Sequence, residues 1–453
     1  MVDNKTIAAI ATGTGGGIGV VRLSGMDALT IAAAVFSGNK APQRMPGYTG
    51  TLGRVHDRDG VLDQAVLFVY RAPHSYTGED VCELSCHGGS YLLQRVLGAV
   101  IEAGAVPAAP GEFTKRALLN GKLTLTEAEA VAQLIAAESR QAAGAALDAY
   151  DGALFHTIAA VTDSLGDGAA HISAWMDYPE EDVEEVLVCQ LSQLLTAQQA
   201  QLTALVNSFD SGRLLREGIS TAIVGSPNVG KSTLMNLLSG SQRSIVTDIP
   251  GTTRDVVEER VRLGELLLNL ADTAGIHNTD DPVERIGVAR SVAKLERCDL
   301  VLAVFDGSRP LDSTDLSLLE RLEGRAAIGL CNKSDLPQRA DLEKIAASTC
   351  GVVELSALDG DGVDRLEQAI TQVVGIRKLQ PGGAQLANQR QLSCVVAAVQ
   401  ALDEALQALS YGQTLDAVSV CMEEAVGALL ELTGKQASTE IIDRVFENFC
   451  VGK

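Results

Sequence analysis

The chain has 453 residues, 46% of them hydrophobic and only 4% aromatic, which predicts about three domains with cores of Ala, Leu, Val and Ile. The formal net charge of −22 argues against non-specific binding of polyanions over the whole surface, so a nucleic acid would need a local basic patch or a partner protein. The nine cysteines are scattered and odd in number, which argues against a disulfide framework. With no signal pattern and no long apolar run, we expect a soluble, cytoplasmic protein.

The first region, 1–118, mixes short apolar runs with turns. Strands are expected at 6–11, 18–23 and 64–70, and the periodicity of 91–101 predicts a helix. This mixture is typical of an α+β domain.

Two cysteines and a histidine lie close together in this region. Cys82, Cys86 and His87 could bind a metal, but no second ligand pair follows at zinc-like spacing. A strand with both cysteines on one face is therefore the favoured interpretation.

The rest of the chain predicts an α/β domain inserted into a helical domain. Residues 119–215 are helical in pattern, and Thr126 and Glu129 have the spacing of a capping box. From 216 to 376 apolar strands alternate with helical segments, which indicates a parallel α/β sheet. Residues 377–453 are helical again. The expected strands of the sheet are 220–224, 266–270, 300–305, 326–330 and 352–355.

The strongest motif is a phosphate loop. Residues 225–232 match G-x-x-x-x-G-K-[ST], between an expected strand at 221–224 and an expected helix at 233–238. Its glycines let backbone N–H groups surround phosphate oxygens, while Lys231 can reach the β- and γ-phosphates and Ser232 can bind Mg²⁺. The positive end of the helix dipole adds to this attraction.

Three further motifs follow in order, each after an expected strand. Asp272 begins Asp-Thr-Ala-Gly, which can hold the Mg²⁺ shell and sense the γ-phosphate. Asp335 ends Asn-Lys-Ser-Asp, and its carboxylate can accept from guanine N1–H and N2–H₂, donors that adenine does not offer together. Ser356 and Ala357 suit a loop that closes over the base. The four motifs predict GTP binding and hydrolysis.

The residues leave the catalytic groups open. Ile276 stands where many small GTPases carry a water-orienting glutamine. No arginine finger stands out, although Arg254 lies in the candidate switch segment 247–255. The amide oxygen of Asn228 could hold a monovalent cation between the phosphates, or Asn228 could be an ordinary turn residue.

Motifs along essentially the whole chain resemble one family, the bacterial tRNA-modification GTPases MnmE (TrmE). The motifs are 6–12, 16–25, 76–80, 111–117, 120–123, the GTPase motifs, and the tail Phe-Cys-Val-Gly-Lys at 449–453. The resemblance implies a multidomain α+β and α/β protein. Its parts would be a folate-binding and dimerisation domain (1–118), a helical domain (119–215 and 377–453) and an inserted Ras-like P-loop GTPase domain (216–376).

The resemblance also implies K⁺-stimulated, Mg²⁺-dependent GTP hydrolysis. Glu284 would orient the attacking water, although by itself it reads as a solvated carboxylate at a helix start. The implied K⁺ ligands are Asn228, Thr247, Ile249 and Thr252, and the implied Mg²⁺ ligands are Ser232 and Thr253. The implied GTP-binding residues are Asn228, Val229, Gly230, Lys231, Ser232, Thr233, Thr247, Asp248, Ile249, Pro250, Gly251, Thr252, Thr253, Asp272, Thr273, Ala274, Gly275, Asn332, Lys333, Asp335, Ser356 and Ala357.

A second implied site binds a tetrahydrofolate derivative of the 5-formyl or methylene type. Cys450 would be the catalytic thiol, after a helix with Ile441, Val445 and Phe449 on one stripe; a buried cysteine at a helix end is an equal alternative. The implied folate-binding residues are Arg22, Glu83, Lys122 and Lys453.

The reaction implied by the resemblance adds a carboxymethylaminomethyl-type group to C5 of the wobble uridine of tRNA. A homodimer would act with an FAD- and NADH-using partner, MnmG (GidA), and a partner that holds much of the tRNA would fit the charge of −22. The alternative is a GTP-switch interaction protein such as a ribosome-assembly GTPase, which shares the phosphate loop and Ile276. Arg22, Lys122 and the tail favour the enzyme.

Overall fold

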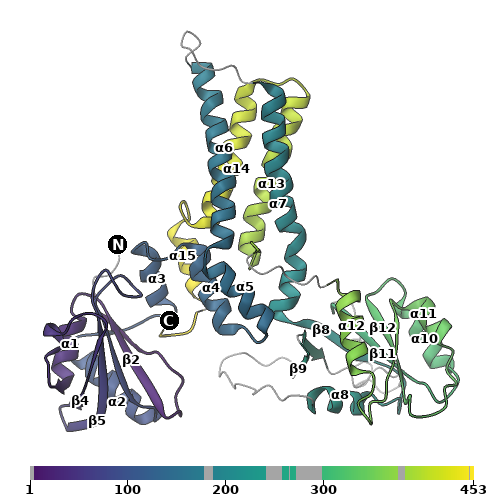
Figure 1. Cartoon of the computed structure of the whole chain (residues 1–453), viewed down its shortest axis with the longest axis horizontal. Coiled ribbons are helices and arrows are strands. Elements are labelled where there is room, and N and C mark those ends of the chain that lie inside the picture. Colours follow the sequence, from purple (N-terminus) through teal and green to yellow (C-terminus); the bar gives the residue numbers. More distant parts are fainter. Residues whose placement is uncertain are drawn as a thin grey trace, which may run out of the picture. The chain divides into compact units, whose positions relative to one another are not determined.

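The computed structural model describes residues 5–177, 187–240, 258–264, 266–271, 298–375, 383–447 and 449–452. Its contacts divide the chain into two compact units (Figure 1). The first unit comprises Met1–Ala132, Ala149–Leu202 and Ser393–Lys453, and the second comprises Gln133–Asp148 and Thr203–Leu392. The domain boundaries expected at 118, 215 and 376 remain predictions.

The N-terminal part of the first unit is a seven-stranded sheet in the order β3-β4-β5-β6-β2-β1-β7, antiparallel except for the β1–β7 pair. Helices α1 and α2 pack on one face, where Leu93 and Val96 of α2 join Leu67 and Leu84 in one apolar core. The α+β prediction is confirmed. The elements are β1 Ile7–Ile10, β2 Ile18–Ser24, α1 Ala28–Val35, β3 Phe36–Gly38, β4 Thr49–Asp57, β5 Gly60–Tyr70, β6 Val81–His87, α2 Ser90–Glu102 and β7 Val106–Pro107.

The strand predicted to carry two cysteines on one face is β6. Cys82 and Cys86 are buried two positions either side of the buried Leu84, as the two-residue period of a strand requires. His87 is exposed, and its Nδ1 lies 2.8 Å from Oδ1 of Asp63. The cysteines and the histidine therefore point to different surroundings.

The remainder of the first unit is helical. Buried residues on α6 recur every three or four positions, for example Ile158, Val161 and Leu165, and this stripe packs against α14. The helices described in whole or in part in this unit are α3 Glu112–Leu119, α4 Leu125–Ala136, α6 Ala153–Asp177, α7 Val188–Glu217, α13 Gln389–Ser410, α14 Leu415–Thr433 and α15 Thr439–Phe446.

Helix α13 is, within the described residues, the one helix long and apolar enough to suit a membrane span by length and composition. Core helices of soluble proteins pass the same test. Val395, Ala398, Leu402 and Ala405 of α13 are completely buried, and their spacing puts them on one stripe. That stripe accounts for much of the apolar character of the helix.

The capping box of α4 lies two residues earlier than predicted. The backbone N–H of Thr124 donates to Oε2 of Glu127 (2.8 Å), and that of Glu127 donates to Oγ1 of Thr124 (3.3 Å). Thr126 and Glu129 are instead buried within the helix. Because both pairs share the same spacing, the pattern could not distinguish them; the helix start at Leu125 does.

The second unit contains a six-stranded sheet in the order β13-β12-β11-β8-β10-β9. All neighbouring pairs are parallel except β10–β9, so the predicted parallel α/β sheet is confirmed. Helices α8 and α12 contribute to the core cluster on one face, and α10 and α11 to a separate cluster. The elements are α5 Arg140–Tyr150, β8 Ile219–Val224, α8 Lys231–Gly240, β9 Glu258–Leu263, β10 Leu266–Ala271, β11 Leu300–Asp306, α10 Ser313–Leu322, β12 Ala327–Asn332, α11 Leu342–Ser348, β13 Val352–Glu354 and α12 Val363–Val373.

One strand of this sheet was not predicted. Strand β9 alternates charged residues such as Arg260 and Arg262 with the buried Val261 and Leu263. It forms the sheet edge, where charged side chains reach solvent and discourage pairing with other chains.

Candidate functional site

The phosphate loop connects β8 to α8, as predicted. Gly225 has φ 151°, and a Cβ there would lie 2.3 Å from the carbonyl oxygen of Val304. Gly230 has φ 102°, and a Cβ there would lie 2.1 Å from Nδ2 of Asn332. Both positions therefore require glycine. Asn228 takes φ 64°, a left-handed conformation that asparagine tolerates better than most residues.

The side-chain amine of Lys231 is hydrogen-bonded to the backbone of this loop. Its Nζ donates to the carbonyl oxygens of Gly225 and Ser226, each at 2.8 Å. Burial lowers the pKa of this amine, because desolvation disfavours the charged form. Ser232 and Thr233, at the start of α8, are exposed. The arrangement places a cation and a helix N-terminus beside exposed hydroxyls, which suits a phosphate chain with Mg²⁺.

The base-recognition motif is tied to the phosphate loop by one buried amide. Nδ2 of Asn332 donates to the carbonyl oxygen of Val229 (2.8 Å), and its Oδ1 accepts from the backbone N–H of Ala357 (2.9 Å). Asp335 is exposed, and its Oδ1 accepts from Oγ of Ser356 (3.0 Å). Three motifs separated along the chain therefore meet at the carboxyl ends of parallel strands, where α/β sheets bind ligands.

One residue of this site was missed by sequence reasoning. Asp306 ends β11, and its Oδ2 lies 2.5 Å from Nζ of Lys333, which has φ 65°. Burial alone would raise the Asp306 pKa, but hydrogen bonds from Lys333 and Ser308 outweigh it and hold the pKa below its ordinary value. An aspartate at the end of a fully buried strand was the available signal.

Several predicted GTP-site residues lie outside the described residues. They are Thr247, Asp248, Ile249, Pro250, Gly251, Thr252, Thr253, Asp272, Thr273, Ala274, Gly275 and Glu284, as are Arg254, Ile276 and the terminal Lys453.

In the first unit, two of the predicted folate residues form an ion pair. Arg22 on β2 faces Glu83 on β6 in the sheet register, with Nε 2.8 Å from Oε1. The Arg22 guanidinium also lies over the Phe113 ring, 5.6 Å from its centroid. Burial, and next the nearby Glu83 carboxylate, raise the Tyr70 pKa. Lys122 donates to the carbonyl oxygen of Pro73 (3.2 Å).

The C-terminal tail runs beside this pair. Gly111, with φ 64°, allows Phe446 and Phe449 to pack against it, since a Cβ would lie 2.8 Å from Cβ of Phe449. Its N–H donates to the carbonyl oxygen of Cys450 (3.3 Å), and Arg22 donates to that of Gly452 (3.4 Å).

The predicted stripe on the last helix is wrong for Phe449. Helix α15 ends at Phe446, so Phe449 lies after the helix, with its ring centroid 4.9 Å from that of Phe446. Cys450 is exposed, which contradicts the alternative of a buried cysteine. The backbone that carries this thiol is thus held close to Arg22.

Brief iodoacetamide treatment of the folded chain should label Cys450 together with the exposed Cys189 and Cys350, and should spare Cys82 and Cys86. Burial raises the pKa of Cys82 and Cys86 to about 12, so their thiols stay protonated at pH 8. Peptide mass spectrometry would measure the labelling. Labelling of Cys82 before Cys450 would contradict the described packing, and denatured chain is the control in which every cysteine should react.

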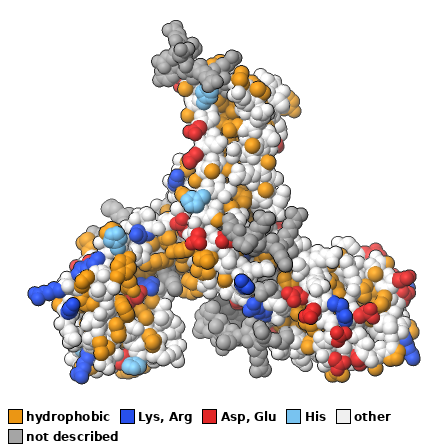
Figure 2. Space-filling view, in the orientation of Figure 1, with side chains coloured by type: hydrophobic (Ala, Val, Ile, Leu, Met, Phe, Trp, Pro, Cys, Tyr) orange, Lys and Arg blue, Asp and Glu red, His pale blue; other side chains and the backbone are white. Residues whose placement is uncertain are grey.

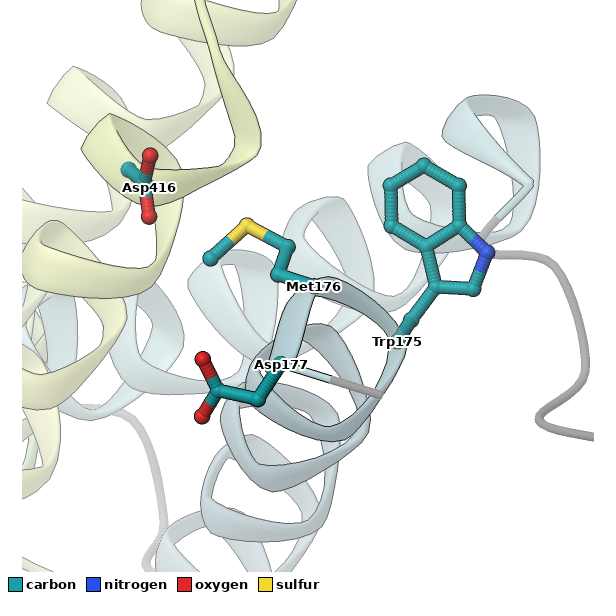
Figure 3. Close-up of a pocket in the computed structure, with 4 residues that line it drawn as sticks. All are labelled: Trp175, Met176, Asp177 and Asp416. Atoms are coloured by element: carbon teal, nitrogen blue, oxygen red, sulfur yellow. The ribbon is translucent and has the colours of Figure 1, made fainter. Parts of the chain in front are cut away.

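A cavity of about 600 Å³ lies at the far end of α6. In Figure 3 the side chains of Met176 and Asp177, at the end of α6, extend toward Asp416 of α14, while the Trp175 ring points away from it. Within the described part of the chain, no predicted site residue lines it, and its described lining has two carboxylates but no cation that could hold a phosphate.

Two family models cover nearly the whole chain. The MnmE helical domain matches residues 125–450, and the GTP-binding protein TrmE N-terminus matches residues 6–122. The chain belongs to the MnmE family. The first match spans the sheet of the second unit, which agrees with an α/β domain inserted into a helical one.

Full-length relatives agree with the family assignment. Proteins named tRNA modification GTPase MnmE are 41% identical over 462 residues in Geobacillus kaustophilus and 40% identical over 460 residues in Oceanobacillus iheyensis; each alignment covers 100% of both chains. The Heliobacterium modesticaldum relative is 42% identical over 462 residues, covering 99% of each chain.

Proposed function

We propose that this member of the MnmE family uses GTP hydrolysis to drive addition of a carboxymethylaminomethyl-type group to C5 of the wobble uridine of tRNA. The names of its full-length relatives support a GTPase of tRNA modification. The observation that carries the GTP part of the proposal is the buried Asn332 amide, which joins the phosphate loop to the loop of Ser356 and Ala357. This contact supports one site in which the proposed guanine-binding and phosphate-binding residues act together.

Roles at the GTP site follow from chemistry and family. Lys231 would bind the β- and γ-phosphates, Ser232 and Thr253 would hold Mg²⁺, and Asp335 would accept from the guanine edge. The exposed position of Ser232 at the start of α8 supports its share of this assignment. Mg²⁺ would neutralise charge that develops on the phosphate oxygens.

Potassium, but not sodium, should stimulate GTP hydrolysis, with Asn228, Thr247, Ile249 and Thr252 as the proposed ligands. The exposed Asn228 at φ 64° supports a role beyond packing. Asn228→Gly is the sharpest variant, because glycine keeps the left-handed backbone and removes only the amide. Phosphate release measured in matched KCl and NaCl should show stimulation in the wild type and none in the variant; equal rates in both salts would end the cation proposal.

Glu284 is proposed to orient the attacking water, since Ile276 cannot. Glu284→Ala should therefore leave GTP affinity within about twofold of wild type and lower kcat by roughly 10²-fold or more. Equilibrium binding of a fluorescent GTP analogue and single-turnover hydrolysis separate the two effects. An unchanged kcat would refute the assignment.

A tetrahydrofolate derivative is proposed to bind near Arg22 and Glu83, with Lys122 and Lys453 contributing. The ion pair beside the tail supports this placement, since an arginine and a carboxylate can pair with a pterin edge or a glutamate tail. Arg22→Ala should weaken binding of 5-formyltetrahydrofolate in calorimetry, and unchanged affinity would count against the site.

The proposed partners are a second copy of this chain, MnmG and tRNA, in the cytoplasm. On the face shown in Figure 2, Lys and Arg side chains lie along the outer edge of the N-terminal sheet domain, while the α/β unit carries acidic and basic side chains together. A local basic edge supports contact with tRNA, because the whole chain is acidic.

Nucleoside analysis of tRNA from cells that lack this gene is the decisive experiment. Loss of the C5 modification on wobble uridines, restored by the wild-type gene but not by Lys231→Ala, would support the proposal. Unaltered wobble uridines, with altered ribosome profiles instead, would favour the GTP-switch alternative.

A further inference from the structure

A buried carboxylate, that of Asp315, accepts a hydrogen bond from the phosphate loop. Oγ of Ser226, the second residue of the loop, donates to Oδ1 of Asp315 (2.7 Å). Ser226 is 5% exposed and Asp315 is 1% exposed, so the contact is excluded from water. The partners are 89 positions apart in the chain. They meet because β11, which α10 follows, pairs with β8, the strand that leads into the phosphate loop.

Asp315 is more than a helix cap. It belongs to the capping box of α10, in which Asp312 accepts from the N–H of Asp315 and Asp315 accepts from the N–H of Asp312. Its Oδ2 also pairs with Nη2 of Arg309 (3.0 Å). A buried carboxylate needs several such partners to offset its lost hydration. Arg309 in turn pairs with Asp312 (2.9 Å), so these three side chains form a fixed support.

The hydrogen bond from Ser226 to Asp315 also bears on Lys231, the residue proposed to bind the phosphates. The carbonyl oxygen of Ser226 is one of the two acceptors of the Lys231 amine, at 2.8 Å. The side-chain hydroxyl of Ser226 is the group that donates to Asp315. A continuous path therefore runs from Arg309 through Asp315 and Ser226 to Lys231.

The same segment also reaches the base-recognition loop. Asp306, at its start, pairs with Lys333, and the N–H of Gly307 donates to the carbonyl oxygen of Asn332 (2.8 Å). Gly307 cannot be replaced without conflict, since a Cβ would lie 2.9 Å from that same oxygen. Segment 306–315 thus contacts both the loop that binds phosphates and the loop that reads the base.

We propose that segment 306–315 is a brace for the GTP site, and that Asp315 is a positioning residue that holds Ser226, and through it Lys231, ready for the phosphates. The proposal rests on GTP binding at this site, and it adds residues outside the GTPase motifs. Without the brace the loop could still form, but one of the two carbonyl acceptors of the Lys231 amine, that of Ser226, would no longer be held in place.

The test measures nucleotide release from the full chain by stopped-flow fluorescence with mant-GDP, together with steady-state GTP hydrolysis. Ser226→Ala and Asp315→Ala should each speed release by about five- to tenfold and raise KM more than they change kcat, because one buried charge-assisted hydrogen bond is lost. Ser226→Thr keeps the hydroxyl and should release mant-GDP at close to the wild-type rate. The double variant should show little more than either single change, since both remove the same contact.

The matched control is Asp341→Ala, which removes the N-cap of α11, a cap that accepts from the N–H of Lys344. It should lower the melting temperature without changing release. If Asp315→Ala does not fold, Ser226→Ala and Ser226→Thr still decide the matter. Wild-type release from Ser226→Ala, or equally fast release from Asp341→Ala, would overturn the brace. A wild-type chain that binds no guanine nucleotide would instead overturn the proposed function.

Discussion

Replacing Lys231 with alanine should abolish GTP hydrolysis and weaken GTP binding by roughly a hundredfold or more, because truncating one partner of a buried charge pair costs several kcal/mol. The amine is already held by the carbonyl oxygens of Gly225 and Ser226. Its lowered pKa reflects burial, and within the described residues its hydrogen-bond acceptors are these two neutral carbonyl groups. A polyphosphate would add negative charge beside the amine, so the binding free energy should depend strongly on it.

Isothermal calorimetry with GTP and a non-hydrolysable analogue would measure this effect. Lys231→Arg keeps the charge with a different shape, and should recover part of the affinity but little of the turnover. Circular dichroism should show a folded variant, since Lys231 is only half-buried and contributes no core packing. Wild-type affinity in the alanine variant would remove the phosphate loop as the nucleotide site.

The second large effect is a change of base specificity. Asp335→Asn should lower GTP affinity by on the order of a hundredfold, because two hydrogen bonds to an ionised acceptor are lost or reversed. Xanthine carries a carbonyl where guanine carries the 2-amino group. The new amide could donate to that carbonyl and accept from N1–H, so the variant should prefer XTP.

Competition of GTP and XTP against a fluorescent nucleotide would measure the switch. Asp359→Asn is a matched control, since Asp359 also accepts from Ser356 (3.1 Å) but lies outside the Asn-Lys-Ser-Asp motif. It should leave the preference for GTP intact. If Asp335→Asn lost GTP and XTP affinity equally, Asp335 would act on the shape of the loop and not on the base.

Strands and helices of the α/β unit were predictable because their signals are local. A continuous apolar run as short as 300–305 of β11 favours a buried strand over a helix, and turn residues mark its end. Strand β9 was not predicted because its alternating charged residues resemble a solvated loop. Only its pairing with β10 at the edge of the sheet shows that it is a strand. The start of α4 was predicted two residues too late because two overlapping Thr–Glu pairs, 124/127 and 126/129, have the spacing of a capping box.

The same division holds for the candidate site. Motifs of eight residues or fewer identified Lys231, Asn332 and Asp335. Such motifs are short because one loop must surround the ligand with its own backbone. Asp306 and Asp315 carry no such motif. Their contacts with Lys333 and Ser226 appear only when β11 is paired with β8 and β12, which brings the ends of those strands together.

The sequence by itself therefore indicated the class of the protein, most elements of the α/β unit and the residues proposed to recognise GTP, since each depends on residues close together in the chain. Only the tertiary structure decided that Ser226 rests on Asp315 and that the tail at Cys450 lies against Gly111. Contacts of this kind join residues 89 or more than 300 positions apart. Their partners are chosen by the topology of sheets and by burial, which leave no fixed spacing in a sequence.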